Sequence, residues 1–217
     1  MTGTDTGAGK SIVAAAICAA LVARGERVAA FKPAVTGLDE PVADWPLDHA
    51  LLATAAGAGQ AGEQVAPYRF GPALSPHYAA ELAGETIEPA RLLAVARSAG
   101  DRLLVAEGVG GLMVPLTSGY LVRDLAVDLG LPLVVAARSG LGTINHTLLT
   151  VESARAAGLS VAGVVMTPWP RAPEPIERSN RETVERLSGV AVSGLPPTSP
   201  QTLAEAGEEL ALDEWLR

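Results

Sequence analysis

The sequence predicts an α/β fold: a doubly wound, mostly parallel sheet with helices on both faces. Stretches expected to form strands alternate with stretches expected to form helices, which is the order typical of such sheets. The strands are continuous apolar runs, as a sheet buried on both faces requires. We expect strands at residues 27–31, 102–106, 131–137, 161–166 and, with a weaker pattern, 190–192.

Helices are expected in the segments between these strands. Several of them stop at a glycine, which is a common helix end. The chain of residues 1–217 is predicted to form one domain, without an internal repeat or a linker. Residues 67–76 are expected to be irregular. The expected helices span 10–24, 48–56, 75–83, 88–99, 121–129, 174–187 and 201–210, and another runs from the turn at 140–146 to about 157.

Composition excludes several classes of protein. A hydrophobic content of 48% excludes a disordered chain. A net charge of −8, without a basic stripe, argues against a partner that is a nucleic acid. No apolar run approaches the ~20 residues that span a bilayer, and no signal peptide is recognisable, so we expect a cytoplasmic protein without membrane partners. The single cysteine, Cys18, is expected to be a core residue.

A glycine-rich turn stands at the start: Met1-Thr2-Gly3-Thr4-Asp5-Thr6-Gly7-Ala8-Gly9-Lys10-Ser11. An apolar helical run follows it, so the turn is predicted to be a phosphate-binding loop, and the fold to be of the P-loop NTPase type. Backbone N–H groups of Gly7, Ala8, Gly9 and the helix start at Lys10, Ser11 and Ile12 would surround an anion. Lys10 would reach the β- and γ-phosphates of ATP, and the Ser11 hydroxyl would hold Mg²⁺.

The P-loop is expected to follow a buried strand, but only Met1 and Thr2 precede Gly3. The N-terminal strand is therefore expected to be truncated, which would leave backbone groups of its neighbours unpaired. We expect the natural protein to begin several residues upstream with a short apolar run.

Further polar residues follow strands at the same predicted edge of the sheet. Ligands of open α/β sheets bind beyond the carboxyl ends of the strands, where Lys32 and Thr36 are expected. Glu107 ends the strand at 102–106, and Gly108, Val109 and Gly110 after it allow a close approach of the backbone to a ligand. Asp48 begins a helix and is either a cap or a metal ligand.

Together these residues predict a Mg²⁺–nucleotide site. Ser11, Asp48 and Glu107 offer the hard oxygen atoms that Mg²⁺ accepts beside phosphate oxygens. Lys10 and Lys32 are the expected catalytic residues. Lys32 follows a different strand from the P-loop, so it can neutralise a second anion near the γ-phosphate. Such a site suits phosphoryl transfer to an anionic acceptor.

The motifs resemble those of the dethiobiotin synthetase family, in the same order and up to about residue 170. The five residues between Gly3 and Gly9, rather than the usual four, are also that family's spacing. The motifs are the P-loop, Lys32-Pro33 with Thr36-Gly37, Ser75-Pro76-His77, Glu107-Gly108-Val109-Gly110-Gly111 with Val114-Pro115-Leu116, and the run from Gly142 to Thr150.

The resemblance implies the penultimate step of biotin synthesis. The substrates would be 7,8-diaminononanoate, CO₂ and ATP, and the enzyme would be a homodimer with Mg²⁺ as cofactor. It implies that Thr6 and Thr36 contact the substrate, and that Gly142 and Asn145 bind its carboxylate across the dimer interface. It also implies a base pocket at Thr167 and Pro168, completed by Leu195, Pro196 and Pro197.

Departures from the family pattern predict loose selectivity for the nucleotide base. Family members often carry an acid and a bulky residue in the P-loop, where this chain has Gly7 and Ala8, and some present Asn-Asp to the base, where it has Thr167-Pro168. The segment near Leu195 matches the family's pattern only loosely. Ser75-Pro76-His77 either contacts the substrate or has only a structural role at the start of a helix.

Two other P-loop classes share parts of this pattern. An amidotransferase-type synthetase of cobyrinate chemistry needs a glutaminase domain with a nucleophilic cysteine, and Cys18 is the only cysteine. A partition or septum-site ATPase switch is the alternative function. Such proteins carry an extra signature lysine early in the P-loop, which residues 1–9 lack, and a basic or amphipathic tail, whereas residues 205–217 are acidic.

Overall fold

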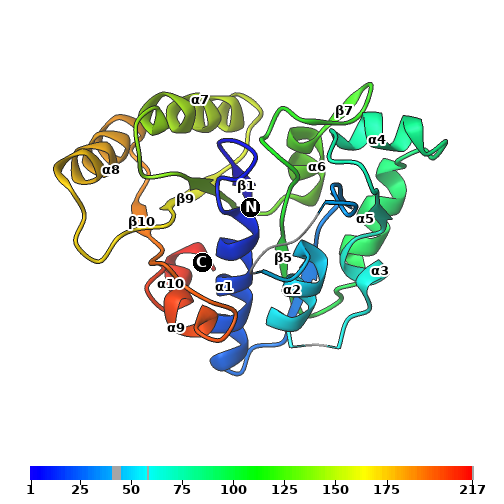
Figure 1. Cartoon of the computed structure of the whole chain (residues 1–217), viewed down its shortest axis with the longest axis horizontal. Helices are drawn as coiled ribbons and strands as arrows, with labels where there is room; N and C mark the ends of the chain where they lie inside the picture. Colours follow the sequence, from blue (N-terminus) through cyan, green and yellow to red (C-terminus); the bar gives the residue numbers. More distant parts are fainter. Residues whose placement is uncertain (41–44, 58, 217) are drawn as a thin grey trace.

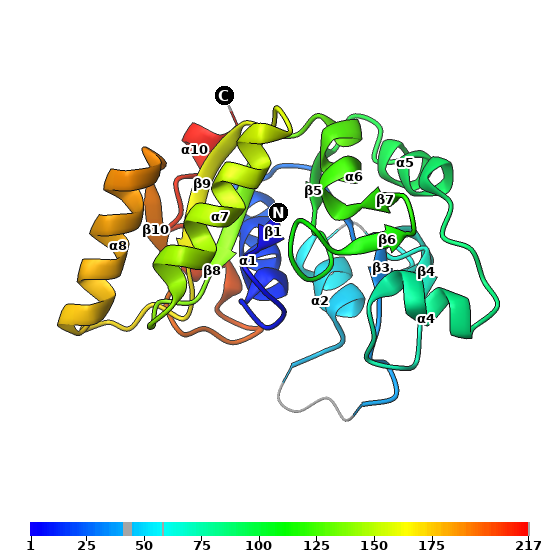
Figure 2. The ribbon, with the colours of Figure 1, turned by 90° about the horizontal axis from the view of Figure 1, so that it is seen from above.

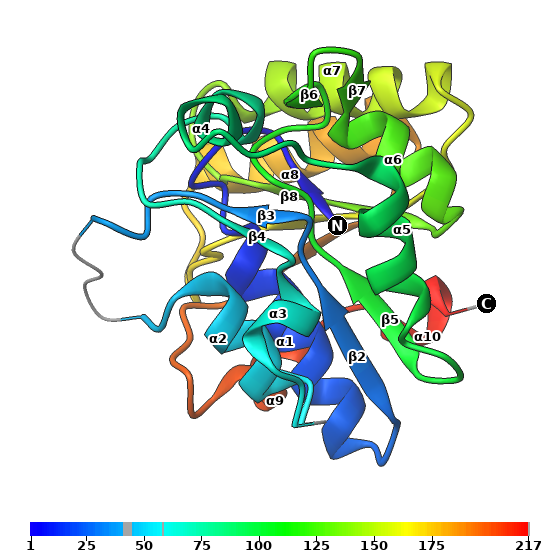
Figure 3. The same cartoon turned by 90° about the vertical axis from the view of Figure 1, so that its right-hand side faces the viewer.

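The computed structural model describes residues 1–40, 45–57 and 59–216 (Figure 1). Its main sheet is parallel and lies in two parts. The first part holds, side by side in this order, β1 (Thr2–Gly3), β8 (Leu133–Ala137), β9 (Val161–Met166) and β10 (Val192–Gly194). The second part pairs β2 (Val28–Phe31) with β5 (Leu103–Ala106), and Figure 3 shows these two strands side by side.

Helices cover both faces of the sheet, as a doubly wound fold requires. α1 (Lys10–Ala23) lies on one face, with α9 (Leu203–Gly207) packed against it, whereas α7 (Thr143–Ala156) and α8 (Pro175–Ser188) lie on the other (Figure 1). β8 shows why both faces are apolar. Its Val134 and Ala136 join the core around α1, whereas its odd-numbered residues join the core around α7.

The second part of the sheet has its own covering elements (Figure 2). Phe31 of β2 belongs to a third core cluster, which includes residues of α4, α5 and α6. The remaining elements are α2 (Asp48–Ala55), α3 (Gly62–Val65), α4 (Pro76–Leu82), α5 (Pro89–Arg97), α6 (Val122–Leu129), α10 (Leu212–Trp215), the parallel pair β3 (Ala34–Val35) and β4 (Tyr68–Arg69), and the antiparallel pair β6 (Pro115–Thr117) and β7 (Tyr120–Leu121).

The expected α/β fold is confirmed, and most expected elements lie within two residues of their predicted bounds. Three expectations were wrong in detail. Residues 67–76 are not wholly irregular, because Tyr68 and Arg69 pair with β3. The last strand is at 192–194 rather than 190–192. The helix expected at 201–210 ends at Gly207, where α9 meets α1 so closely that an added Cβ would lie 2.2 Å from the carbonyl oxygen of Ala16.

The strand that leads into the P-loop is two residues long. Thr2 pairs with Val135 and Gly3 with Ala136 of β8. On the other side, the amino group of Met1 donates a hydrogen bond to the carbonyl oxygen of Ala106 at 2.7 Å. Met1 therefore joins the two parts of the sheet at one point, at the end where the P-loop begins.

No helix in the described part of the chain is long and apolar enough to cross a membrane.

Candidate functional site

The P-loop and the ends of neighbouring strands enclose a cavity of about 410 Å³. Thr6, Gly7, Gly9, Lys10, Ser11, Ile12, Lys32, Thr36, Asp48, Glu107, Val109 and Gly110 were predicted from the sequence and line it. Sequence reasoning missed Ala34, Trp45, Pro46 and Leu51, which line it too. These four carry no chemistry-bearing side chain in a recognisable motif, so only the fold reveals them.

The loop has the shape of an anion cradle. Gly7 and Gly9 have φ angles of 71° and 84°, a left-handed backbone that favours glycine. Gly9 is the N-cap of α1, a helix of 14 residues whose N-terminus faces the loop. The Lys10 stem crosses Gly3, and its Nζ donates to the carbonyl oxygen of Asp5 at 2.9 Å. Lys10 is thus held over the loop, and burial lowers the pKa of its ammonium group although Glu107 opposes this.

Lys32, Asp48, Ser11 and Glu107 form one polar cluster. The Lys32 ammonium donates to Glu107 Oε1 at 2.7 Å and to Asp48 Oδ2 at 2.5 Å. The Ser11 hydroxyl donates to the same Glu107 oxygen at 2.8 Å. Four residues from α1, β2, α2 and β5 therefore meet at the carboxyl edge of the sheet, as the sequence predicted for ligands of this fold.

Two of the three charged side chains of this cluster are almost fully buried. Lys32 is 4% exposed and Glu107 1%, whereas Asp48 keeps contact with solvent. Burial disfavours the Lys32 ammonium, but the Glu107 and Asp48 carboxylates outweigh it and raise the pKa of Lys32. Burial likewise disfavours the Asp48 carboxylate, but Lys32 beside it lowers the pKa of Asp48. Lys32 is therefore a fixed cation and Asp48 a fixed anion near neutral pH.

The oxygen atoms of Ser11, Asp48 and Glu107 are suitable ligands for a divalent cation. Glu107 Oε2 is buried and has no hydrogen-bond partner in the described residues. A buried carboxylate oxygen without a partner is costly unless something satisfies it. The described residues hold no cluster of three His, Cys, Asp or Glu side chains. A metal here would thus take the Ser11 hydroxyl, Asp48, Glu107 and phosphate oxygens of its nucleotide, which is the ligand set that Mg²⁺ accepts.

Other predicted residues lie outside the cavity lining. Gly108 donates its N–H to the carbonyl oxygen of Met1 at 2.9 Å, and Ala8 is fully buried. Thr167 packs its methyl group against the P-loop, because a Cβ on Gly9 would lie 2.4 Å from it. Leu195 is buried in the core around α1. Thr167 therefore adjoins the P-loop, and Leu195 lies in the core. The structure does not bring the residues that were expected to border the base into the cavity.

The turn before α7 lies at the same edge of the sheet. Gly142 caps α7 with a φ of 92°, and Asn145 in the first turn is exposed. Arg138, at the end of β8, donates to the carbonyl oxygen of Thr6 at 3.4 Å and so connects this turn with the P-loop. The sequence did not single out Arg138, because no motif marks it.

Sequence similarity to known proteins extends over almost the whole chain. A family model described as an AAA domain matches residues 1–206. An "ATP-dependent dethiobiotin synthetase BioD" of Anaeromyxobacter dehalogenans is 40% identical over 95% of this chain and 92% of its own length. Proteins of the same name from Rhodococcus erythropolis and Bacillus subtilis are 39% and 34% identical, over 99% and 91% of this chain and 93% and 85% of theirs.

Solved structures support the fold alone. The cell division ATPase MinD of Pyrococcus furiosus is similar with a TM-score of 0.52 and 16% identity, over 96% of this chain and 95% of its own. A ParA family ATPase of Chlorobium tepidum has a TM-score of 0.52 and 14% identity, over 99% of this chain and 93% of its own.

Proposed function

Because the chain belongs to the ATP-dependent dethiobiotin synthetase family, we infer that it is the ligase that makes dethiobiotin in biotin biosynthesis. It would join 7,8-diaminononanoate and CO₂ at the expense of ATP and form C–N bonds. The single observation that carries this proposal is the buried cluster of Lys32, Glu107 and Ser11 beside the P-loop, because its fixed cation would lie next to the γ-phosphate of a nucleotide bound to that loop.

The reaction needs charge neutralisation at two stages. One amine of the substrate takes up CO₂ and becomes a carbamate anion. A carbamate oxygen then attacks the γ-phosphorus of ATP, ADP leaves, and a mixed carbamic–phosphoric anhydride forms. The second amine attacks the carbamoyl carbon, phosphate leaves, and the cyclic urea closes. Both the carbamate and the transferring phosphoryl group are anionic, so a preorganised cation lowers the barrier.

We propose the following roles for the residues of the cavity. The Lys10 ammonium holds the phosphates, and the N–H groups from Gly7 to Ile12 surround them. The Lys32 ammonium faces the carbamate and the transferring group. Ser11, Asp48 and Glu107 hold Mg²⁺, which when bound would supply positive charge to the phosphate oxygens. Thr6 and Thr36 lie on the walls of the cavity, where they could contact the diamine.

From the sequence alone, Asp48 is either a helix cap or a metal ligand. The second role is supported by two observations. The N-cap residue of α2 is Leu47 rather than Asp48, and the Asp48 carboxylate pairs with Lys32 inside the cluster.

A homodimer and a cytoplasmic location belong to the same proposal. Gly142 and Asn145 would bind the substrate carboxylate of the neighbouring protomer, for which the exposed N-terminus of α7 is chemically suited. Thr167, Pro168, Pro196 and Pro197 are proposed to border the base, and the fully buried Leu195 is proposed to hold this segment against the core around α1.

Mass spectrometry of a reaction with the diamine, bicarbonate and Mg²⁺–ATP tests the function. We expect a product heavier than the diamine by one CO₂ less one H₂O, formed only when all three are present. A partition-type ATPase would instead hydrolyse ATP in response to DNA or lipid and give no such product. ATP hydrolysis that DNA or lipid stimulates, and that the diamine does not, would contradict the proposed function.

A further inference from the structure

The charged side chains that line the P-loop cavity cancel one another. In the described part of the chain they are two cations and two carboxylates, Lys10, Lys32, Asp48 and Glu107. A nucleoside triphosphate and a carbamate bring several negative charges into this cavity, and the proposed Mg²⁺ offsets only part of them. A further cation close to the cavity would therefore favour the transfer of the phosphoryl group.

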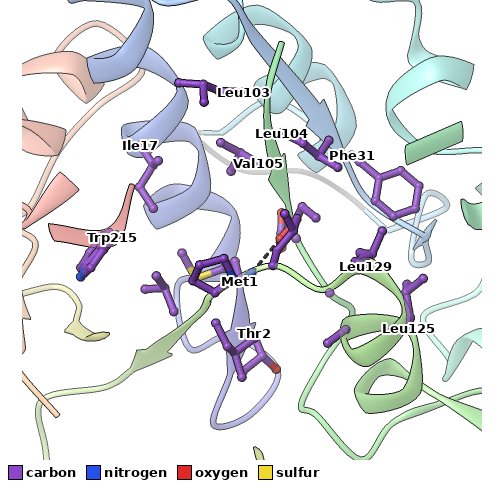
Figure 4. Close-up of a pocket in the computed structure, with 18 of the residues that line it drawn as sticks. Met1, Thr2, Ile17, Phe31, Leu103, Leu104, Val105, Leu125, Leu129 and Trp215 are labelled. Atoms are coloured by element: carbon purple, nitrogen blue, oxygen red, sulfur yellow. Dashed lines mark hydrogen bonds between the residues drawn. The ribbon is translucent and has the colours of Figure 1, made fainter. Parts of the chain in front are cut away.

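Glu107 also lines a second cavity, of about 360 Å³, which offers no such cation. Its walls are mainly apolar side chains, and Figure 4 shows Ile17, Phe31, Leu104 and Leu125 around it. Among the described residues, no lysine, arginine or histidine lines this second cavity. A further cation would therefore have to approach from the other side, at the rim of the P-loop.

Arg138 is a cation at that rim. It follows β8, the strand that pairs with β1, and its Nη2 atom donates to the carbonyl oxygen of Thr6 at 3.4 Å. A Cβ added to Gly7 would lie 3.1 Å from the same nitrogen, so the guanidinium lies over the loop where a glycine leaves room for it. No carboxylate in the described part of the chain forms an ion pair with Arg138, so its charge is available to a ligand.

The contact with Thr6 lies at the end of the cavity that would hold the γ-phosphate. A P-loop lysine reaches the β- and γ-phosphates, and the Nζ atom of Lys10 donates to the carbonyl oxygen of Asp5 at 2.9 Å. The next carbonyl along the chain, that of Thr6, accepts from Arg138. The two cations therefore contact adjacent peptide units, and both would lie within reach of the β–γ junction of a nucleotide bound to the loop.

The backbone around Arg138 is held in place, whereas its side chain is exposed. The carbonyl oxygen of Ala137 before it accepts from Thr167 N–H at 2.9 Å. The carbonyl oxygens of the next two residues accept from Nδ2 of the buried Asn180, at 2.9 and 3.0 Å. The bond to Thr6 is long for a hydrogen bond, so a phosphate oxygen can replace the Thr6 carbonyl as acceptor. A fixed backbone with a free guanidinium suits a residue that contacts substrate.

We propose that Arg138 is a catalytic residue of the phosphoryl transfer, whose guanidinium donates to the oxygen atoms at the β–γ junction of ATP. This role rests on the proposed function, because that reaction supplies the acceptor of the phosphoryl group. A carbamate oxygen forms a bond to the γ-phosphorus, and the bond from that phosphorus to the bridging oxygen breaks. The electron pair of the broken bond stays on ADP, and no proton moves. Negative charge thus grows on the bridging oxygen, and the guanidinium stabilises the transition state more than the bound ATP.

Three variants test this role. Arg138→Ala removes the guanidinium, and Arg138→Lys keeps a charge but not the planar fork. Arg155→Ala is the matched control, because Arg155 is also exposed but lies in the last turn of α7. Turnover and two affinities are measured with the diamine, bicarbonate and Mg²⁺ present. One affinity is for a non-hydrolysable ATP analogue, and the other is for ADP with aluminium fluoride, which mimics the transferring phosphoryl group. The melting temperature of each variant reports whether it folds.

We expect Arg138→Ala to lower turnover by about 100-fold or more, because it removes an arginine that stabilises charge in the transition state. Affinity for ADP with aluminium fluoride should fall by a similar factor, whereas affinity for the ATP analogue should change by less than about threefold. Arg138→Lys should recover only part of the turnover, since an ammonium group cannot reproduce the planar fork. Free guanidinium ions should raise the turnover of Arg138→Ala by about tenfold and leave that of Arg155→Ala unchanged.

Three results would overturn the role of Arg138 alone. The first is a folded Arg138→Ala protein that turns over at the rate of the parent chain. The second is an equal loss of affinity for the ATP analogue and for ADP with aluminium fluoride, which would mean that Arg138 only holds the Thr6 carbonyl. The third is a raised KM for the diamine with unchanged kcat, which would mean that Arg138 binds the substrate carboxylate.

The parent chain separates a failure of this role from a failure of the proposed function. A parent chain that forms no dethiobiotin would overturn the proposed function and this role with it. A parent chain that forms dethiobiotin, beside an equally active Arg138→Ala protein, would overturn the role of Arg138 only. If the alanine variant does not fold, the same comparisons on Arg138→Lys decide.

Discussion

Lys32 is a buried cation that two neighbouring carboxylates stabilise. Its ammonium group contacts two carboxylates and is almost unexposed, so its position and charge are fixed before substrate binds. Lys10, by contrast, contacts the P-loop backbone. We therefore expect Lys32→Ala to lower turnover by about 100-fold or more and to change nucleotide affinity little, as removal of a preorganised charge at a reacting centre does.

Nucleotide affinity and turnover must be measured separately for this variant. Lys10→Ala is the matched comparison, and it should lose nucleotide affinity first. Removing Lys32 also leaves Glu107 buried without its cation, so the melting temperature should be recorded with and without Mg²⁺. Unchanged turnover in a folded Lys32→Ala protein would show that Lys32 has no catalytic role.

Glu107 is the residue whose proposed role in metal binding is easiest to isolate. Glu107→Gln keeps the size of the side chain and removes the negative charge that a hard cation prefers. We expect its loss of activity to be larger at limiting Mg²⁺ than at high Mg²⁺. Activity is titrated against Mg²⁺ in both proteins. A loss that is the same at every Mg²⁺ concentration would assign the carboxylate to orienting Ser11 and Lys32 alone.

Thr167 bears on selectivity for the nucleotide base. Its methyl group packs on Gly9, and Pro168 beside it has no backbone N–H, so these two residues offer little hydrogen-bond readout of adenine. We expect the preference for ATP over CTP and GTP to stay below about 10⁴-fold, the level of a site with dedicated readout. Rates with the three nucleotides at matched concentrations decide this, and a larger preference would show that other residues read the base.

At the scale of elements, the contact of α9 with α1 depends on one glycine. A Cβ at position 207 would lie 2.2 Å from the carbonyl oxygen of Ala16 in α1, which is backbone and cannot move alone. We expect Gly207→Ala to destabilise the fold by about 1–3 kcal/mol, the usual cost of overpacking. For a chain of this length that lowers the melting temperature by roughly 2–12 °C.

Gly119→Ala is the control for this change. No described residue lies within 4 Å of its added Cβ, and its φ is not in the left-handed region. It should melt within about 2 °C of the parent chain, as surface substitutions do. Equal melting temperatures for Gly207→Ala and the parent would mean that α9 can move away from α1 at no cost.

The long helices and strands could be predicted from the sequence, whereas strands of two residues could not. α1 and α7 begin after a glycine-rich turn, and β8 and β9 are uninterrupted apolar runs. Both kinds of signal can be recognised in the sequence. β3 and β4 have two residues each, too few to show any alternation. The hairpin of β6 and β7 had a usable signal, because Ser118-Gly119 is a two-residue turn of the kind that joins antiparallel strands.

The same reasoning explains which parts of the site were predictable. Lys10, Lys32 and Glu107 follow strands or the P-loop, and the rule that ligands bind at the carboxyl edge of a parallel sheet brings them together. Trp45 and Arg138 depend on how loops cross that edge, and no local pattern determines this. The ion pair of Lys32 with Asp48 joins two elements whose distance only the packed fold defines.

At the scale of the whole molecule, three exposed apolar side chains lie on or beside α7. Leu141 just before α7 is 93% exposed, and Leu149 on α7 is also exposed. Met113, exposed as well, reaches Ser153 of α7. Exposed apolar side chains that gather on one element are typical of a surface that binds another protein. We therefore expect the proposed homodimer to form through α7, next to Gly142 and Asn145.

Leu141→Glu tests the dimer and its link to substrate binding together. A charge at this position should convert the protein to a monomer in sedimentation experiments, because an unpaired charge at the centre of an interface is costly. The KM for the diamine should rise by about tenfold or more, since each protomer would lose the α7 N-terminus of its neighbour, while ATP affinity should stay within about twofold. Leu82→Glu, on the exposed side of α4, is the matched control and should leave both properties unchanged. A Leu141→Glu protein that remains dimeric would place the interface elsewhere, and a monomer with normal KM would remove Gly142 and Asn145 from the substrate site of the partner.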